Sequence, residues 1–192
     1  MAVPSSLHPE SVVPRLRGRF GHPYLYVEVC PSTQRLLGDE HSEGAVALTE
    51  EQTEGRGRLG RSWHSPAGVS LLFSVLLEPP VETVRLPELT VVAGEAVRES
   101  IVAVTGLTPE IKLPNDVLVA GRKTAGILAE AREGRVVLGI GVNVNVPAEE
   151  LPGEAATSLL VERGSEVDRV ELLVEILDHL ERHYDRWTAT AR

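Results

Sequence analysis

The stretch from Glu110 to Asn145 reads EIKLPNDVLVAGRKTAGILAEAREGRVVLGIGVNVN and contains four strand-like segments in close succession. These segments are 110–113, 117–120, 126–131 and 136–144. Two of the steps between them, Ala120-Gly121-Arg122-Lys123 and Glu133-Gly134, have the composition of tight hairpin turns. Because strands joined by tight turns pair antiparallel, this stretch predicts the centre of a mixed or largely antiparallel sheet.

Further strands and helices are predicted on both sides of this stretch. Strand-like runs rich in valine and leucine or tyrosine occupy 24–30, 44–49 and 69–77. The main helix is predicted over 86–105, and a final helix with one apolar stripe is predicted to start at Asp168. Ser32 or Thr33 is expected to cap a short helix over 34–39. Strands gather in the middle without regular βαβ alternation, so the predicted fold class is α+β, a sheet flanked by helices.

The composition limits the class of protein. The 192 residues are 42% hydrophobic and 24% charged, which fits a single globular domain better than a disordered chain. A net charge of −9 argues against a nucleic-acid partner. The single cysteine, Cys30, cannot form an internal disulfide and favours a reducing compartment. No apolar run approaches membrane-spanning length and Met1–Ser6 lacks a signal-peptide layout, so we expect a cytoplasmic protein without membrane contact.

The most informative loop is Gly55–Trp63, which reads GRGRLGRSW. Its glycines match the dinucleotide pattern G-x-G-x-x-G, and the loop also resembles a P-loop and a kinase glycine-rich loop. The first two need a helix directly after the loop, whereas Pro66, Gly68 and then a strand follow here, and the other kinase motifs are absent. Glycines still let backbone N–H groups approach an anion, and three arginines suit carboxylate or phosphate. A solvated basic turn is the alternative, but in so acidic a chain we favour anion binding.

Three further segments carry polar residues that are ordinary when each is taken alone. Lys112–Asp116 (KLPND) has the composition of a turn, and Lys123 stands at the lip of an apolar strand, where a lysine is usually solvated. In Gly139–Asn145 (GIGVNVN), two glycines would weaken a strand unless something approaches its backbone. Its two asparagines are two residues apart, so they are expected to share one face of the strand, where amides need partners.

Taken together and in this order, these segments resemble the catalytic domain of biotin protein ligases. The matching segments are Ser32-Thr33-Gln34, Gln52 ahead of Gly55–Trp63, Lys112–Asp116, Lys123 with Gly126–Leu128, and Gly139–Asn145. The resemblance spans about 24–187. It implies a fold related to class II aminoacyl-tRNA synthetases and lipoyl ligases, with helices on one side of a mixed sheet. It implies a biotin–[acetyl-CoA-carboxylase] ligase that forms biotinyl-5′-AMP and pyrophosphate from biotin and ATP, then transfers biotin to a lysine of a biotin carboxyl carrier protein.

The resemblance also implies residue roles. Arg58 and Lys123 would be catalytic, stabilising charge between the biotin carboxylate and the α-phosphate. Asp116 would serve Mg²⁺. The biotin-binding residues would be Ser32, Thr33, Gln34, Gln52, Arg56, Gly57, Arg58, Lys123 and Gly126. The ATP-binding residues would be Arg56, Arg61, Trp63, Asn115, Lys123 and Asn143.

The chain departs from the family pattern at several places. Leu113 stands where the family usually has tryptophan, and Gln34 replaces the commoner asparagine. We expect residues 1–22 to be an irregular lead-in and 23–192 the catalytic domain, with neither an N-terminal winged-helix domain nor a C-terminal SH3-like domain. The resemblance also suggests a homodimer through an edge formed by 136–145.

Three other functions remain open. A lipoate or octanoate ligase of the same superfold is the nearest, although its usual Arg-Arg-x-Ser/Thr-Gly-Gly loop is not found. A non-catalytic biotin or nucleotide sensor is the second, and the retained Lys123 and arginine loop argue against it. A nucleic-acid-binding module built on the basic loop is the third, and the acidic balance of the chain disfavours it.

Overall fold

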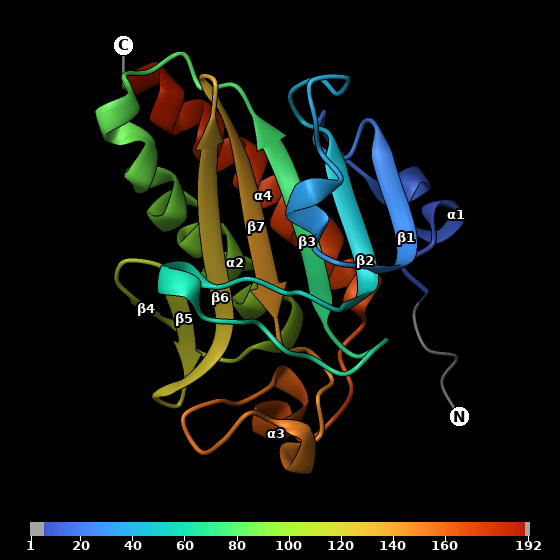
Figure 1. Cartoon of the computed structure of the whole chain (residues 1–192). Helices are drawn as coiled ribbons and strands as arrows, with labels where there is room; N and C mark the ends of the chain where they lie inside the picture. Colours follow the sequence, from blue (N-terminus) through green and yellow to red (C-terminus); the bar gives the residue numbers. More distant parts are fainter. Residues whose placement is uncertain (1–5, 191–192) are drawn as a thin grey trace.

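A computed structural model describes residues 6–190; the first five residues of the predicted lead-in and the last two of the chain lie outside this range. A seven-stranded sheet runs through the molecule in the order β1-β2-β3-β7-β6-β5-β4 (Figure 1). β1 and β2 pair parallel and all other neighbours pair antiparallel, which confirms the predicted mixed, largely antiparallel sheet. The strands are β1 (Tyr24–Cys30), β2 (Val46–Gln52), β3 (Leu71–Leu77), β4 (Glu110–Lys112), β5 (Asp116–Val119), β6 (Arg122–Arg132) and β7 (Arg135–Val142).

Both predicted hairpin turns are present. Ala120-Gly121 joins β5 to β6 and Glu133-Gly134 joins β6 to β7, and all four residues have positive φ angles. Consecutive positive φ values are typical of the type I′ turn, whose twist matches that of the paired strands. β7 is hydrogen-bonded to β3 on one side and to β6 on the other. Residues 136–142 therefore lie inside the sheet and do not form the free edge that the homodimer prediction assumed.

The two long helices cover one face of the sheet. α2 (Leu89–Thr105) and α4 (Arg169–Thr190) lie side by side behind it (Figure 1). The main core fills the space between them and the sheet, and it includes Phe73 of β3 and Leu173 of α4. The opposite face carries only a small apolar cluster and is crossed by the loop after β2.

The helices differ from the predicted ranges in two places. The main helix starts at Leu89 because a 3₁₀ segment, Thr83–Glu88, contains Pro87, which has no N–H to donate. The predicted helix over 34–39 is wrong, since only a 3₁₀ turn forms at Thr33–Arg35. The other short elements are α1 (Pro9–Val12), α3 (Leu159–Arg163) and the 3₁₀ segments Val13–Arg15, Arg58–Gly60 and Ala148–Glu150. Within residues 6–190, no helix is both long and apolar enough to cross a membrane.

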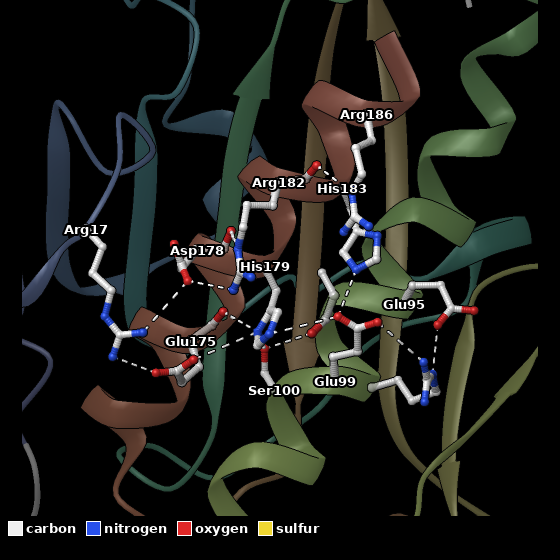
Figure 2. Close-up of polar contacts among 12 residues, drawn as sticks. Arg17, Glu95, Glu99, Ser100, Glu175, Asp178, His179, Arg182, His183 and Arg186 are labelled. Atoms are coloured by element: carbon white, nitrogen blue, oxygen red, sulfur yellow. Dashed lines mark hydrogen bonds and ion pairs between the residues drawn. The ribbon is translucent and has the colours of Figure 1, made fainter. Parts of the chain in front are cut away.

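Polar contacts join α2, α4 and the lead-in (Figure 2). His183 of α4 lies 3.0 Å from the Glu99 carboxylate of α2, and His179 Nδ1 lies 3.0 Å from Ser100 Oγ. Arg17 of the lead-in reaches the Glu175 carboxylate at 2.6 Å. The described lead-in also buries Leu7, Val12 and Phe20 in the main core, so it packs as part of this domain.

Candidate active site

One cavity of about 410 Å³ opens on the sheet face opposite α2 and α4. It lies between the strands β6 and β7 and the glycine–arginine loop that crosses in front of them (Figure 1). Asp116 is outside its lining but is paired with Lys123. All the other predicted site residues line it: Ser32, Thr33, Gln34, Gln52, Arg56, Gly57, Arg58, Arg61, Trp63, Asn115, Lys123, Gly126 and Asn143.

Strand glycines form the floor of this cavity and make room for two of the protein's own side chains. A Cβ at Gly139 would lie 2.5 Å from Gln34 Nε2. A Cβ at Gly141 or at Gly126 would lie 2.7 Å from the Trp63 ring. The glycines that looked costly in the sequence therefore admit Gln34 and Trp63 against the sheet backbone.

The polar end of the cavity is organised around the 3₁₀ turn after β1. Thr33 N donates to Gln52 Oε1 at 2.9 Å, and Thr33 Oγ1 lies 2.8 Å from Ser74 Oγ. Gln34 Nε2 donates to the Leu128 carbonyl at 3.0 Å, while its Oε1 is buried without a hydrogen-bond partner. A buried acceptor without a partner is costly, so this end is suited to a ligand that donates N–H groups. Sequence reasoning missed Ser74, although it is a polar residue inside an otherwise apolar strand.

The glycine–arginine loop forms the other wall and is held at both ends. Arg58 Nη1 donates to Asn115 Oδ1 at 3.2 Å, which joins the loop to the turn before β5. Arg56 forms an ion pair with Glu130 of β6 at 3.0 Å, a partner that sequence reasoning did not identify. Trp63 N donates to the Gly55 carbonyl at 2.8 Å and closes the loop. All three arginines of this loop, Arg56, Arg58 and Arg61, line the cavity.

A bulge turns Lys123 towards the cavity. Val117 pairs with Ala125 but Leu118 pairs with Lys123, so Thr124 is an extra residue in β6. Ala125 faces the main core, and strict alternation would place Lys123 on that same face. One inserted residue reverses the alternation, which brings Lys123 to the site face.

Lys123 is held there by two contacts. Its Nζ lies 2.7 Å from Asp116 Oδ1, close enough for an ion pair although the two are not aligned as a hydrogen bond. The same ammonium lies 5.4 Å from the centre of the Trp63 ring, within range of a cation–π contact. Lys123 thus stands among one carboxylate, one aromatic ring and the open cavity.

The two asparagines after β7 do not share a strand face as predicted. β7 ends at Val142, and both side chains brace the following loop. Asn143 Nδ2 donates to the Thr157 carbonyl at 3.0 Å. Asn145 both donates to and accepts from the backbone of Val167. Asn143 still borders the cavity, but its amide nitrogen is already used.

The site offers little protein-only coordination for a metal ion. Residues 6–190 contain no group of three or more histidine, cysteine or acidic side chains placed to hold one. Asp116 is the carboxylate beside Lys123. Cys30, at the end of β1, is buried, and burial raises the pKa of its thiol, so it is not activated as a nucleophile.

The chain resembles proteins of one family throughout this region. Residues 26–146 match the biotin/lipoate A/B protein ligase family. The bifunctional ligase/repressor BirA of Bacillus spizizenii is 39% identical over 176 residues, covering 85% of this chain and 54% of the relative. The biotin–[acetyl-CoA-carboxylase] ligase of Mycobacterium tuberculosis is 38% identical over 151 residues, covering 76% of this chain and 56% of the relative. The chain thus spans about half the length of these relatives.

A solved structure agrees with the sequence matches. The biotin protein ligase from Aquifex aeolicus in complex with biotin and ATP superimposes with a TM-score of 0.79 and 33% sequence identity. The superposition covers 87% of this chain and 72% of that one. The likeness therefore extends over most of this chain.

Proposed function

The chain belongs to the biotin/lipoate A/B protein ligase family, and on that basis we propose that it is a biotin protein ligase. It forms biotinyl-5′-AMP and pyrophosphate from biotin and ATP and then transfers biotin to a lysine of a biotin carboxyl carrier protein. The observation that carries this proposal is the cavity of about 410 Å³ behind the glycine–arginine loop. It has a polar end at Gln34 and Gln52 and a cationic end at Arg58 and Lys123. Residues 23–192 would form the catalytic domain, in a cytoplasmic protein.

The polar end suits the ureido ring of biotin. The unpartnered Gln34 Oε1 is an acceptor for a ureido N–H, and Thr33, Ser74 and Gln52 offer further polar atoms nearby. A lipoyl ring or an octanoyl chain has no N–H group to satisfy that acceptor. Sites built to hydrogen-bond a substrate reject analogues that lack the group, because buried polar atoms are left unpaired. The contacts therefore favour biotin over lipoate.

The cationic end suits the adenylation step. A carboxylate approaches an anionic phosphate against charge repulsion, which the Arg58 guanidinium and the Lys123 ammonium would offset. An oxygen of the biotin carboxylate bonds to the α-phosphorus, and the bond to the β-phosphate oxygen breaks, releasing pyrophosphate. Arg56 and Arg61 line the same cavity, which supports a role for them in holding the departing anion. Trp63 and Asn115 border the space left for the nucleotide.

The transfer step uses the mixed anhydride made in the first. The neutral amine of the carrier lysine attacks the acyl carbon, the bond to the phosphate oxygen breaks, and AMP leaves while the new amide loses a proton. The wall of Gly55–Trp63 would shield the anhydride from water.

Mg²⁺ fits this site only as an ion that the substrate helps to hold. Magnesium commonly binds one or two carboxylates together with substrate phosphates, and Asp116 supplies one carboxylate here. When bound, the ion would offset phosphate charge. Asp116 would then exchange part of its contact with Lys123 for the ion.

Biotin-dependent exchange of pyrophosphate into ATP tests the proposal. Lys123→Ala and Arg58→Ala should each lower the exchange rate about 100-fold, the usual effect of losing one group that stabilises developing charge. Arg98→Ala is the matched control, because it removes a half-buried arginine of α2, which pairs with Glu95 and Glu99 on the opposite side of the sheet. Exchange at the unaltered rate in both site variants would refute these roles.

A further inference from the structure

Lys123 lies at the start of β6, in the part of the strand that extends beyond the end of β7. β7 pairs with β6 as far as Val142 opposite Ala125, so the first residues of β6 have no β7 residue beside them. The segment 155–157 takes that place. Lys123 N donates to the Ala155 carbonyl at 2.9 Å, and Thr157 N donates to the Lys123 carbonyl at 2.8 Å. These two bonds form a parallel bridge, so a loop takes the place of β7 beside the Lys123 backbone, while Leu118 of β5 is paired with Lys123 on the other side.

Thr157 is the point where this loop is fixed. It is fully buried, and each of its polar groups is used. Its N–H holds Lys123, and its carbonyl accepts from Asn143 Nδ2 at 3.0 Å. Its Oγ1 donates to Glu162 Oε1 at 2.5 Å. Thr157 thus anchors the segment 155–157 through three directional contacts.

Glu162 closes the arrangement into a ring. It lies in α3, and its Oε1 also accepts from Arg122 Nη2 at 2.6 Å. Arg122 precedes Lys123 directly in β6. A path therefore runs from Lys123 through Thr157 and Glu162 to Arg122 and back along the chain to Lys123. The Glu162 side chain is only 12% exposed, so water screens this ion pair weakly.

We propose that Thr157 and Glu162 are positioning residues for the ligase reaction, holding the backbone of Lys123 so that its ammonium stays between Asp116, Trp63 and the cavity. This inference rests on the proposed function. The cavity is lined by Ala155 and Ala156 of the same segment and not by Thr157 or Glu162, so the two residues act through Lys123. A purely stabilising role would change the melting temperature without changing the placement of the lysine.

The test compares Thr157→Val, which keeps the shape but removes the hydroxyl, with Thr157→Ser, which keeps the hydroxyl. Glu162→Gln tests the other end of the contact and also serves if Thr157→Val does not fold. Glu166→Gln is its matched control, because Glu166 is exposed and its carboxylate makes no hydrogen bond or ion pair within residues 6–190. Two measurements are made on each: the kcat and KM for biotin in pyrophosphate exchange, and the acetylation rate of each lysine by N-hydroxysuccinimidyl acetate.

The chain contains only two lysines, so the exposed Lys112 is an internal standard for Lys123. We expect Thr157→Val and Glu162→Gln to lower kcat about ten- to a hundredfold with little change in KM. Both should raise the Lys123-to-Lys112 acetylation ratio, while Thr157→Ser and Glu166→Gln should behave as wild type. Equal kcat and equal acetylation ratios in Thr157→Val and Thr157→Ser would overturn the inference. If wild type shows no exchange with biotin, the proposed function fails, and the acetylation ratio alone decides whether these residues position Lys123.

Discussion

The close approach of Trp63 to Gly141 predicts that adding a methyl group at position 141 lowers both the stability and the activity of the protein. In Gly141→Ala the new Cβ would lie 2.7 Å from Trp63 Cε2, and ordinary contact begins at 3.4 Å. The ring must therefore move by roughly 0.7 Å. Its main chain cannot follow freely, because Trp63 N is bonded to the Gly55 carbonyl at 2.8 Å. Gly141 does not have a positive φ, so alanine fits the backbone there, and the expected effect comes from the contact with the Trp63 ring.

Overpacking of this kind costs about 1–3 kcal/mol. For a domain of this size, each kcal/mol lowers the melting temperature by about 2–4 °C. Because the ring also contacts the Lys123 ammonium, biotin-dependent exchange should fall about ten- to a hundredfold. Gly94→Ala in α2 is the control, since its Cβ would lie at an ordinary 3.7 Å from its neighbours and alanine favours a helix. Melting temperatures are measured by scanning calorimetry and exchange rates by pyrophosphate exchange. Equal values for Gly141→Ala and Gly94→Ala would show that Gly141 is not needed to make room for Trp63.

Two further predictions concern the helices behind the sheet. Asp168 Oδ1 accepts from the N–H groups of Val170 and Glu171, so Asp168→Ala should cost about 1 kcal/mol in urea unfolding while Asp168→Asn should cost less; equal losses would contradict the capping role. The pKa of Glu99 is lowered, chiefly by the hydrogen bond with His183, so its carboxylate stabilises the fold above the usual carboxyl pKa and loses this effect as pH falls through the lowered value. Glu99→Gln should therefore lower the melting temperature at about pH 7, and the difference from wild type should shrink as the pH falls through the lowered pKa of Glu99; a constant difference between the two would contradict this.

The parts of the fold that depend on neighbouring residues could be predicted from the sequence. Ala120-Gly121 and Glu133-Gly134 fix their hairpins because the required positive φ angles are local properties. Asp168 marks the start of α4 for the same reason, since a cap bonds only the next few N–H groups.

What depends on distant pairing could not be predicted. The position of β7 inside the sheet depends on its pairing with β3, and that partner is more than fifty residues away in the chain. The bulge at Thr124 moves the Lys123 side chain to the opposite face of the sheet, and no residue type in that stretch predicts the bulge. Most of the candidate site residues were identified from the family resemblance, whereas Ser74 and Glu130 became visible only when the strands were in place.

The central claim is that this cavity activates biotin. Pyrophosphate exchange into ATP, measured on the same protein with biotin and with lipoate in parallel, tests it most directly. The structure predicts exchange with biotin and little with lipoate, because only biotin can donate N–H groups to the unpartnered oxygen of Gln34. Exchange with lipoate alone would contradict the claim and identify a lipoyl ligase, and exchange with neither would point to a protein that binds without catalysing.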